Sequence, residues 1–140
     1  LYRISEFSIL ISRKETIKEV VESTGEFIKE IYRPVLIEII IDEKNQIVWQ
    51  CNGQRNWTEK VMEVPLIVNK KKAGLIRIAE KEGFKDIDRR ILQLVSLVSS
   101  AAIEGIKHQL QIDRLKEDLM HLDRLSTAGT MVGAIRGHGT

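Results

Sequence analysis

The residues best suited to binding chemistry are polar and aromatic side chains in or beside apolar, strand-like runs: Glu38, Trp49, Trp57 and Arg77. A charged side chain inside a strand needs a partner, and Glu38 and Arg77 could supply one for each other across neighbouring strands. The same two side chains could instead orient a small ligand. Trp49 is expected in the core, whereas Trp57 is expected in a loop, where aromatic residues often make contacts.

Cysteine and histidine add little chemistry. Cys51 is the only cysteine, so no internal disulfide can form, and we expect no metal and no cofactor. The low cysteine content points to a reducing compartment, and the cytoplasm is the expected location. His108 and His121 fit packing or solvated roles better than chemical ones.

Length and charge narrow the classes of function. The 140 residues suffice for one modest domain with an extension, which is small for an enzyme. With 22 basic and 20 acidic residues the net charge is only +2, so nucleic acid is not an expected partner. The basic run Lys70 to Lys72 lies between two apolar runs and predicts a hairpin turn. The apolar runs are too short to cross a membrane, so no membrane contact is expected.

Two helices should precede the strands. Apolar residues recur at helical spacing between Tyr2 and Tyr32, with a break near Ser12 to Thr16. Thr16 and Glu19 have the spacing of a capping box, in which the threonine oxygen accepts a backbone N–H and the glutamate accepts another. The second helix should therefore start there, and Pro34 should end it.

Four strands should follow as two hairpins, over residues 35–42, 46–51, 61–69 and 73–80. The first run has apolar, mostly β-branched residues at both odd and even positions, as in a central strand that is covered on both faces. Helices packed against such an antiparallel sheet make an α+β fold.

The last third of the chain carries an apolar seven-residue repeat that predicts one long helix paired with a second copy. Leu, Ile and Val residues flank a stretch of small or polar seam residues, Ala101, Gly105 and His108, which should pack weakly against a partner. At this weak centre we expect a conformational signal to be absorbed. We also expect Ile4, Phe7 and Ile11 of the first helix to contribute to the homodimer. The seam consists of Ile87, Ile91, Leu94, Val98, Ala101, Gly105, His108, Ile112, Leu115, Leu119, Leu122, Ser126 and Gly129.

The block VPLIVNKKKAGLIRIAEKEGFKDIDRRILQLVSLVSSAAIEGI resembles the C-terminal half of a GAF domain, and the resemblance extends from about Leu10 to Ile106. It implies a sensory module whose five- or six-stranded antiparallel sheet carries the N- and C-terminal helices on one face. Such domains bind small ligands on the other face or bind nothing. Asn69, Lys70, Phe84 and Asp88 also resemble part of a cyclic-nucleotide signature, but Arg89 replaces its final acid. Helix capping by Asp86 or Asp88 explains the acids without a ligand.

The stretch DRLSTAGTMVGAI, residues 123–135, resembles the start of the dimerisation helix of sensor histidine kinases. The family pattern implies a phosphoacceptor histidine at position 137, where this chain has Gly137 followed by His138. His138 is therefore only a weak phosphoacceptor candidate. Without an ATP-binding domain, this part of the chain is not expected to be an enzyme by itself, although a parent chain would be a protein histidine kinase.

Together these features predict a GAF-like sensor domain over residues 1–106, a signalling coiled coil over residues 107–128, and a truncated kinase helix or an appended tail over residues 129–140. The expected partners are a second copy, a kinase core and a response regulator. A small ligand is possible but not favoured, because the segment from Asn52 to Lys60 is short for a pocket lid. The alternatives are a regulatory domain of a transcription activator and a stand-alone ligand sensor.

Overall fold

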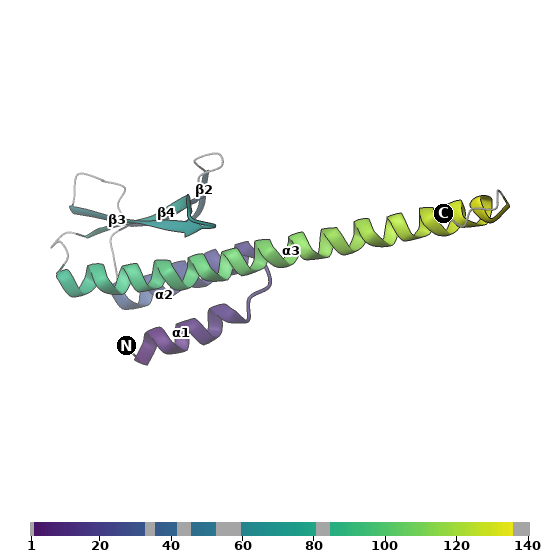
Figure 1. Cartoon of the computed structure of the whole chain (residues 1–140). Helices are drawn as coiled ribbons and strands as arrows, with labels where there is room; N and C mark the ends of the chain where they lie inside the picture. The colour runs from purple at the N-terminus through teal and green to yellow at the C-terminus, as the bar shows by residue number, and fades with distance from the viewer. Residues whose placement is uncertain (1, 33–35, 42–45, 53–59, 81–84, 136–140) are drawn as a thin grey trace. The chain divides into compact units, whose positions relative to one another are not determined.

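The computed structural model describes residues 2–32, 36–41, 46–52, 60–80 and 85–135. The chain divides into two units, residues 1–106 and residues 107–140. The fold is α+β, with an antiparallel sheet and a long C-terminal helix, as the sequence predicts (Figure 1). No helix in these ranges is both long and apolar enough to cross a membrane.

Two helices begin the first unit, α1 (Tyr2–Ser12) and α2 (Ile17–Tyr32). The predicted capping residues start α2: the backbone N–H of Glu19 donates to Oγ1 of Thr16 at 3.1 Å. The Glu19 carboxylate accepts from the Thr16 hydroxyl at 2.9 Å, where a full capping box would use a backbone N–H. The predicted stop signal, Pro34, lies outside the described residues.

The sheet contains β1 (Leu36–Ile41), β2 (Gln46–Asn52), β3 (Lys60–Val68) and β4 (Lys71–Glu80), in the order β2-β1-β4-β3. All neighbouring strands are antiparallel. The predicted hairpin is confirmed, but its turn lies earlier than expected. Asn69 and Lys70, with φ of 53° and 65°, join β3 to β4 as a two-residue turn, and Lys71 and Lys72 belong to β4. The described residues form four strands, whereas the GAF resemblance implies five or six.

The third helix, α3 (Asp86–Ile135), is a single 50-residue helix. The backbone N–H of Lys85 donates to the Asp88 carboxylate at 2.8 Å, so Asp88 caps the helix as the sequence predicts. Residues 86–106 of α3 belong to the first unit, and the rest of the helix belongs to the second.

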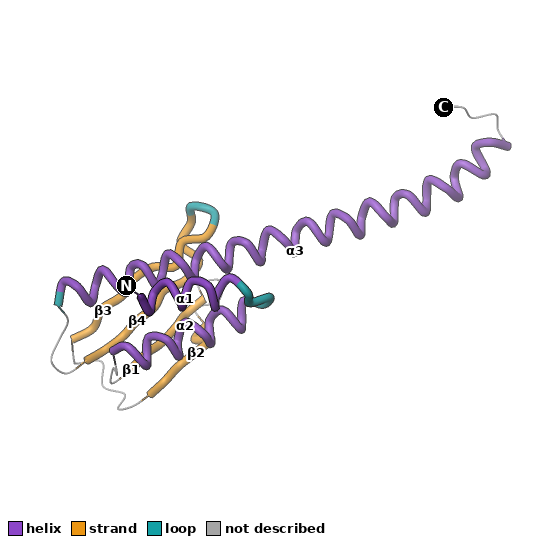
Figure 2. Tube along the Cα trace, turned by 90° about the horizontal axis from the view of Figure 1, so that it is seen from below, coloured by secondary structure: helices purple, strands orange, loops and turns teal. Residues whose placement is uncertain are grey.

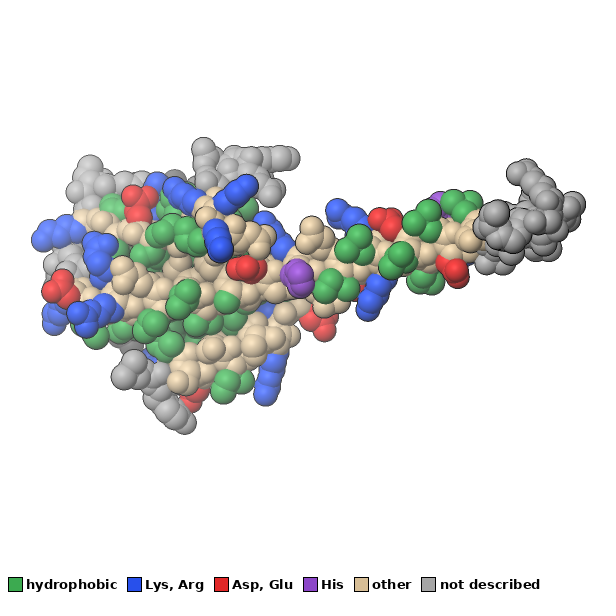
Figure 3. Space-filling model, viewed as in Figure 1, with side chains coloured by type: hydrophobic (Ala, Val, Ile, Leu, Met, Phe, Trp, Pro, Cys, Tyr) green, Lys and Arg blue, Asp and Glu red, His purple; other side chains and the backbone are tan. Residues whose placement is uncertain are grey.

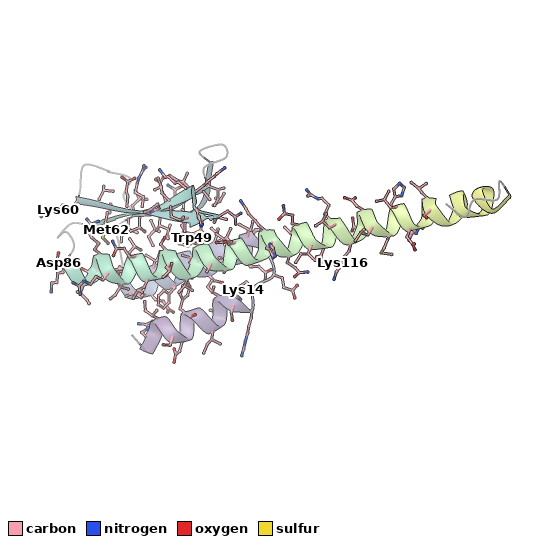
Figure 4. The ribbon with its side chains drawn as sticks, in the orientation of Figure 1. Lys14, Trp49, Lys60, Met62, Asp86 and Lys116 are labelled. Atoms are coloured by element: carbon pink, nitrogen blue, oxygen red, sulfur yellow. The ribbon has the colours of Figure 1, made fainter. Side chains whose placement is uncertain are left out.

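The first unit is layered, with the sheet on one side of α2 and α3 and with α1 on the other side of these helices (Figures 1 and 2). The core between the layers contains Ile37, Ile39, Met62, Ile76, Ile78, Leu92 and Val95. Figure 4 shows Met62 and Trp49 between the sheet and the helices.

The prediction that Phe7 and Ile11 contribute to a dimer surface is wrong. Both side chains are buried, and the Phe7 ring stacks on that of Phe27 with 4.3 Å between centroids. Ile4 also packs against the core, so the apolar stripe of α1 faces inward. The exposed apolar residues of α1 are Ile9 and Leu10 instead.

Candidate functional site

A row of polar side chains crosses all four strands on the face of the sheet that points away from the helices. Because side chains alternate along a strand, Glu38 lies opposite to the core residues Ile37 and Ile39. The strand register then places Glu38 beside Gln50 and Arg77, and Arg77 beside Glu63. The row therefore reads Gln50, Glu38, Arg77, Glu63.

The side chains of this polar row are bonded to one another. The Gln50 amide donates to Glu38 at 3.2 Å, and Arg77 donates to Glu38 at 3.4 Å and to Glu63 at 2.9 Å. The Glu38 side chain is only 6% exposed, whereas those of Arg77 and Glu63 are 32% and 50% exposed. The predicted ion pair between Glu38 and Arg77 is thus confirmed, and one guanidinium serves two carboxylates.

This bonding determines what the polar row can do. A buried carboxylate is stable only with a partner, and Arg77 and Gln50 fill that role for Glu38 from the two neighbouring strands. The row therefore acts as a structural cross-link between β2, β1, β4 and β3. A ligand-orienting role for Glu38 and Arg77 stays a prediction, since a ligand would have to compete with these bonds.

The other predicted binding residues are placed as follows. Trp49 is half-buried and packs against the core, on the helix side of the sheet, opposite to the polar row. Its ring covers Gly25 of α2 so closely that a Cβ there would lie 2.4 Å from it. Cys51 is a free, half-buried thiol on the same side. Trp57 and His138 lie outside the described residues. Within the described ranges no three His, Cys, Asp or Glu side chains are grouped to hold a metal ion.

Within the first unit, only some of the predicted seam residues of α3 are exposed to solvent, and the others pack against the core. Ile87 and Leu94 are exposed, and so is Ala101, whereas Ile91 and Val98 are half-buried against the core. Leu97, which is not a seam residue, is 66% exposed, the highest value among the large apolar residues whose burial the structure describes.

In the second unit, the described seam residues other than Ile112 are solvent-exposed in the single chain. Leu115, Leu119 and Leu122 are 58%, 65% and 58% exposed, and Ile112 is half-buried. His108 and His121 are exposed as well. Hydrophobic side chains are visible on the surface of this part of α3 in Figure 3.

The inward face of α3 contains three buried serines that sequence reasoning missed. Ser96 donates to the carbonyl oxygen of Pro65, and Ser100 accepts the backbone N–H of Ile67 at 3.1 Å. Ser99 lies 2.7 Å from the hydroxyl of Thr24 on α2. Because the Thr24 hydroxyl donates its proton to the carbonyl of Val20, Ser99 must be the donor between the two hydroxyls. Ser99 and Ser100 follow Ser96 at three and four residues, as Leu92 and Val95 precede it, and this spacing is the signal that could have identified this face.

A shallow groove of about 270 Å³ separates α3 from the edge strand β3. Its lining comes from Val64, Pro65 and Ile67 on the strand and from Gln93, Ser96, Leu97 and Ser100 on the helix. The groove is largely apolar because the Ser96 and Ser100 hydroxyls are bonded to the β3 backbone.

Comparison with known proteins does not assign the chain to a family. No protein-family model matches the sequence. No curated protein matches it either.

Proposed function

We propose that this chain is the sensory, regulatory part of a two-component sensor histidine kinase. A GAF-like domain would pass a signal through paired copies of α3 to a kinase core and its response regulator. The α+β architecture supports this proposal, with an antiparallel sheet covered on one face by the N- and C-terminal helices. The sequence of residues 123–135, which resembles the start of a kinase dimerisation helix, supports the same output.

The observation that carries the proposal is the exposed leucine row of the second unit. Burying a leucine side chain stabilises a protein or a complex by about 1.5–3 kcal/mol. Leu115, Leu119 and Leu122 are exposed in a single chain, so their burial would stabilise a dimer. Their spacing of four and three residues fits a two-stranded coiled coil, in which each seam side chain packs against the partner's seam. A parallel pair of α3 helices is the arrangement that delivers both C-terminal ends to one kinase core.

The weak centre of the seam suggests where the paired helices would change their packing. Gly105 and His108 flank the boundary between the two units, which falls after Ile106. No side chain lies within 4 Å of a Cβ added at Gly105, so the helix is thinly packed at this point. A small shift of helix register or crossing angle would therefore disturb few contacts there.

Two variants with matched exposure test the paired seam. Leu115, a seam residue, and Leu110, which lies on the opposite side of the helix from the seam, are 58% and 55% exposed. Neither Leu115→Glu nor Leu110→Glu should disturb the single chain, because both side chains already face solvent. We expect light scattering to show a dimer for the parent chain and for Leu110→Glu, and a monomer for Leu115→Glu. Identical masses for all three proteins would refute the seam.

A fusion series tests the kinase output separately. The full chain would be joined to the dimerisation and catalytic core of a sensor histidine kinase, with one to seven residues inserted at the junction. If paired helices transmit the signal, autophosphorylation should depend on insert length and return at seven residues, because a whole heptad restores the seam. Activity that is independent of insert length would favour a different output, such as that of a transcription activator.

A further inference from the structure

The outer edge of β3 is suited to bind an extended peptide. β3 lies at one end of the sheet order, so one side of its backbone has no neighbouring strand. Successive residues of an antiparallel strand direct their N–H and C=O groups to alternate sides. The Pro65 carbonyl and the Ile67 N–H bond to serines of α3 at this edge, so Val61 and Glu63 direct their backbone groups outward as well.

Helix α3 covers only part of this edge. Its two serines occupy the Pro65 carbonyl and the Ile67 N–H, and proline has no N–H of its own. Among the described residues, no hydrogen bond joins the outward N–H and C=O groups of Val61 and Glu63 to another element. These two residues, the open edge, therefore offer the main-chain groups with which an added strand pairs.

The groove between β3 and α3 continues the open edge. Both elements begin at the same end of the first unit, where Figure 4 labels Lys60 and Asp86. The groove follows along the strand, between Pro65 and Leu97. A cavity of about 150 Å³ accommodates a benzene molecule, so the groove's volume of about 270 Å³ is ample for one large apolar side chain. None of its lining residues belongs to the seam, so the proposed coiled coil does not use it.

Cations lie at both ends of this surface. Lys60 precedes the open edge, and Arg89 lies one helical turn before the groove. The three lysines of residues 70–72 lie at the other end of β3, and all five cations are exposed. The Glu63 carboxylate between the two ends is bonded to Arg77. Figure 3 shows Lys and Arg side chains at both ends, with hydrophobic side chains between them. The surface therefore complements a segment that is apolar at its centre and acidic at its ends.

The β3 edge of a second copy would fit this surface poorly. An antiparallel pairing of two β3 edges about Glu63 would place Val61 opposite Pro65, which lacks an N–H and whose carbonyl is already bonded. It would also place one Glu63 beside the other, and like charges on opposite residues are unfavourable. The expected occupant is therefore a segment of a different protein.

We propose that the β3 edge binds an extended acidic segment of a partner protein by strand addition. The main chain of the segment pairs with Val61 and Glu63, and one large apolar side chain enters the groove beside Leu97. Acidic residues at its ends lie near Arg89 and near the lysines of residues 70–72. At about 3.3 Å per residue, a segment of about eleven residues matches the strand from Lys60 to Lys70. This binding is independent of the proposed signalling function.

A labelled peptide tests the binding. The probe is an eleven-residue peptide with leucine at its centre, two acidic residues at each end and serine or threonine elsewhere, and fluorescence anisotropy reports its binding to the full chain. Replacing the central leucine by serine, or introducing Leu97→Glu, should weaken binding about tenfold or more. Ile9→Glu, on the similarly exposed Ile9 of α1, is the matched control and should leave the affinity unchanged. No saturable binding at protein concentrations up to about 1 mM would overturn the proposal.

Charge variants test the acidic ends of the segment. Arg89→Glu should weaken binding about fivefold. Glu104→Lys should strengthen it, because Glu104 lies one turn beyond the groove residue Ser100 and repels an acidic end. A peptide with lysines at its ends should bind more weakly than the acidic peptide. Equal affinities for the two peptides would refute the charge complementarity.

Two N-methylated forms of the peptide test strand addition itself. Methylating the amides of one set of alternate residues removes the N–H groups that face β3, and methylating the other set removes those that face away. We expect one form to bind at least tenfold more weakly than the other. Hydrogen exchange should also slow at the backbone N–H groups of Val61 and Glu63. Equal affinities of the two forms, or unchanged exchange at these groups, would overturn strand addition.

Two further measurements separate this site from a membrane surface and from the coiled coil. Binding to vesicles of phosphatidylserine and phosphatidylcholine, without binding to the peptide, would identify an anionic membrane as the occupant and overturn the proposal. The Leu115→Glu variant should bind the peptide as the parent chain does. Peptide binding by that variant would therefore survive a failure of the coiled coil, whereas a failed edge site would leave the dimer mass unchanged.

Discussion

Removing the Arg77 side chain should cost far more stability than removing the Glu38 carboxylate, although the two form one ion pair. In Arg77→Met, the Glu38 carboxylate, 6% exposed, keeps only the Gln50 amide, at 3.2 Å, among the partners that the described residues give it. Breaking a fully buried ion pair costs about 3–5 kcal/mol. Because Arg77 is itself 32% exposed and water can partly replace it, we expect a loss of about 2–3 kcal/mol.

The opposite deletion leaves its partner satisfied. In Glu38→Gln, Arg77 still pairs with Glu63 at 2.9 Å, and the new amide can accept the remaining guanidinium N–H. The loss should be about 1 kcal/mol, that of an ordinary hydrogen bond. Glu63→Gln is the control on the exposed side of Arg77, with an expected loss of about 0.5 kcal/mol or less.

Urea unfolding followed by circular dichroism at neutral pH would measure all three losses. The three variants and the parent chain must be compared at one protein concentration, because self-association contributes to apparent stability. In thermal unfolding, Arg77→Met should lower Tm by about 10–20 °C and Glu38→Gln by about 4–8 °C. Equal losses, or a larger loss for Glu38→Gln, would refute the argument that the buried carboxylate dominates this polar row.

Three further substitutions probe the helices. Gly25→Ala should destabilise the chain by about 1–3 kcal/mol, since its Cβ would lie 2.4 Å from the Trp49 ring; an unchanged urea midpoint would show that the ring can move. Thr16→Ala should cost about 1 kcal/mol through loss of the α2 cap, which the same titration measures. Gly105→Leu should raise Tm, because leucine favours helix and meets open space within the chain; a fall would contradict the assigned seam.

The local elements were predictable because their signals lie within a few residues of one another. The Thr16 cap, the hairpin of β3 and β4, and the long helix follow from backbone chemistry and from apolar periodicity, although the turn of the hairpin lies earlier than Lys70 to Lys72. The pairing of Glu38 with Arg77 was predictable for a related reason. A charge within an apolar strand requires a neighbour of opposite sign, and few candidates were available.

What covers each apolar face was decided by the tertiary structure. The stripe containing Phe7 and Ile11 is equally compatible with a core and with a dimer surface, and only the packing of Phe7 on Phe27 placed it inside. Conversely, Ser96 and Ser100 look like surface residues, yet they are buried because the edge of β3 offers a carbonyl and an N–H at matching intervals. A sequence determines which faces are apolar or polar, whereas the contact between distant elements determines which of them water can reach.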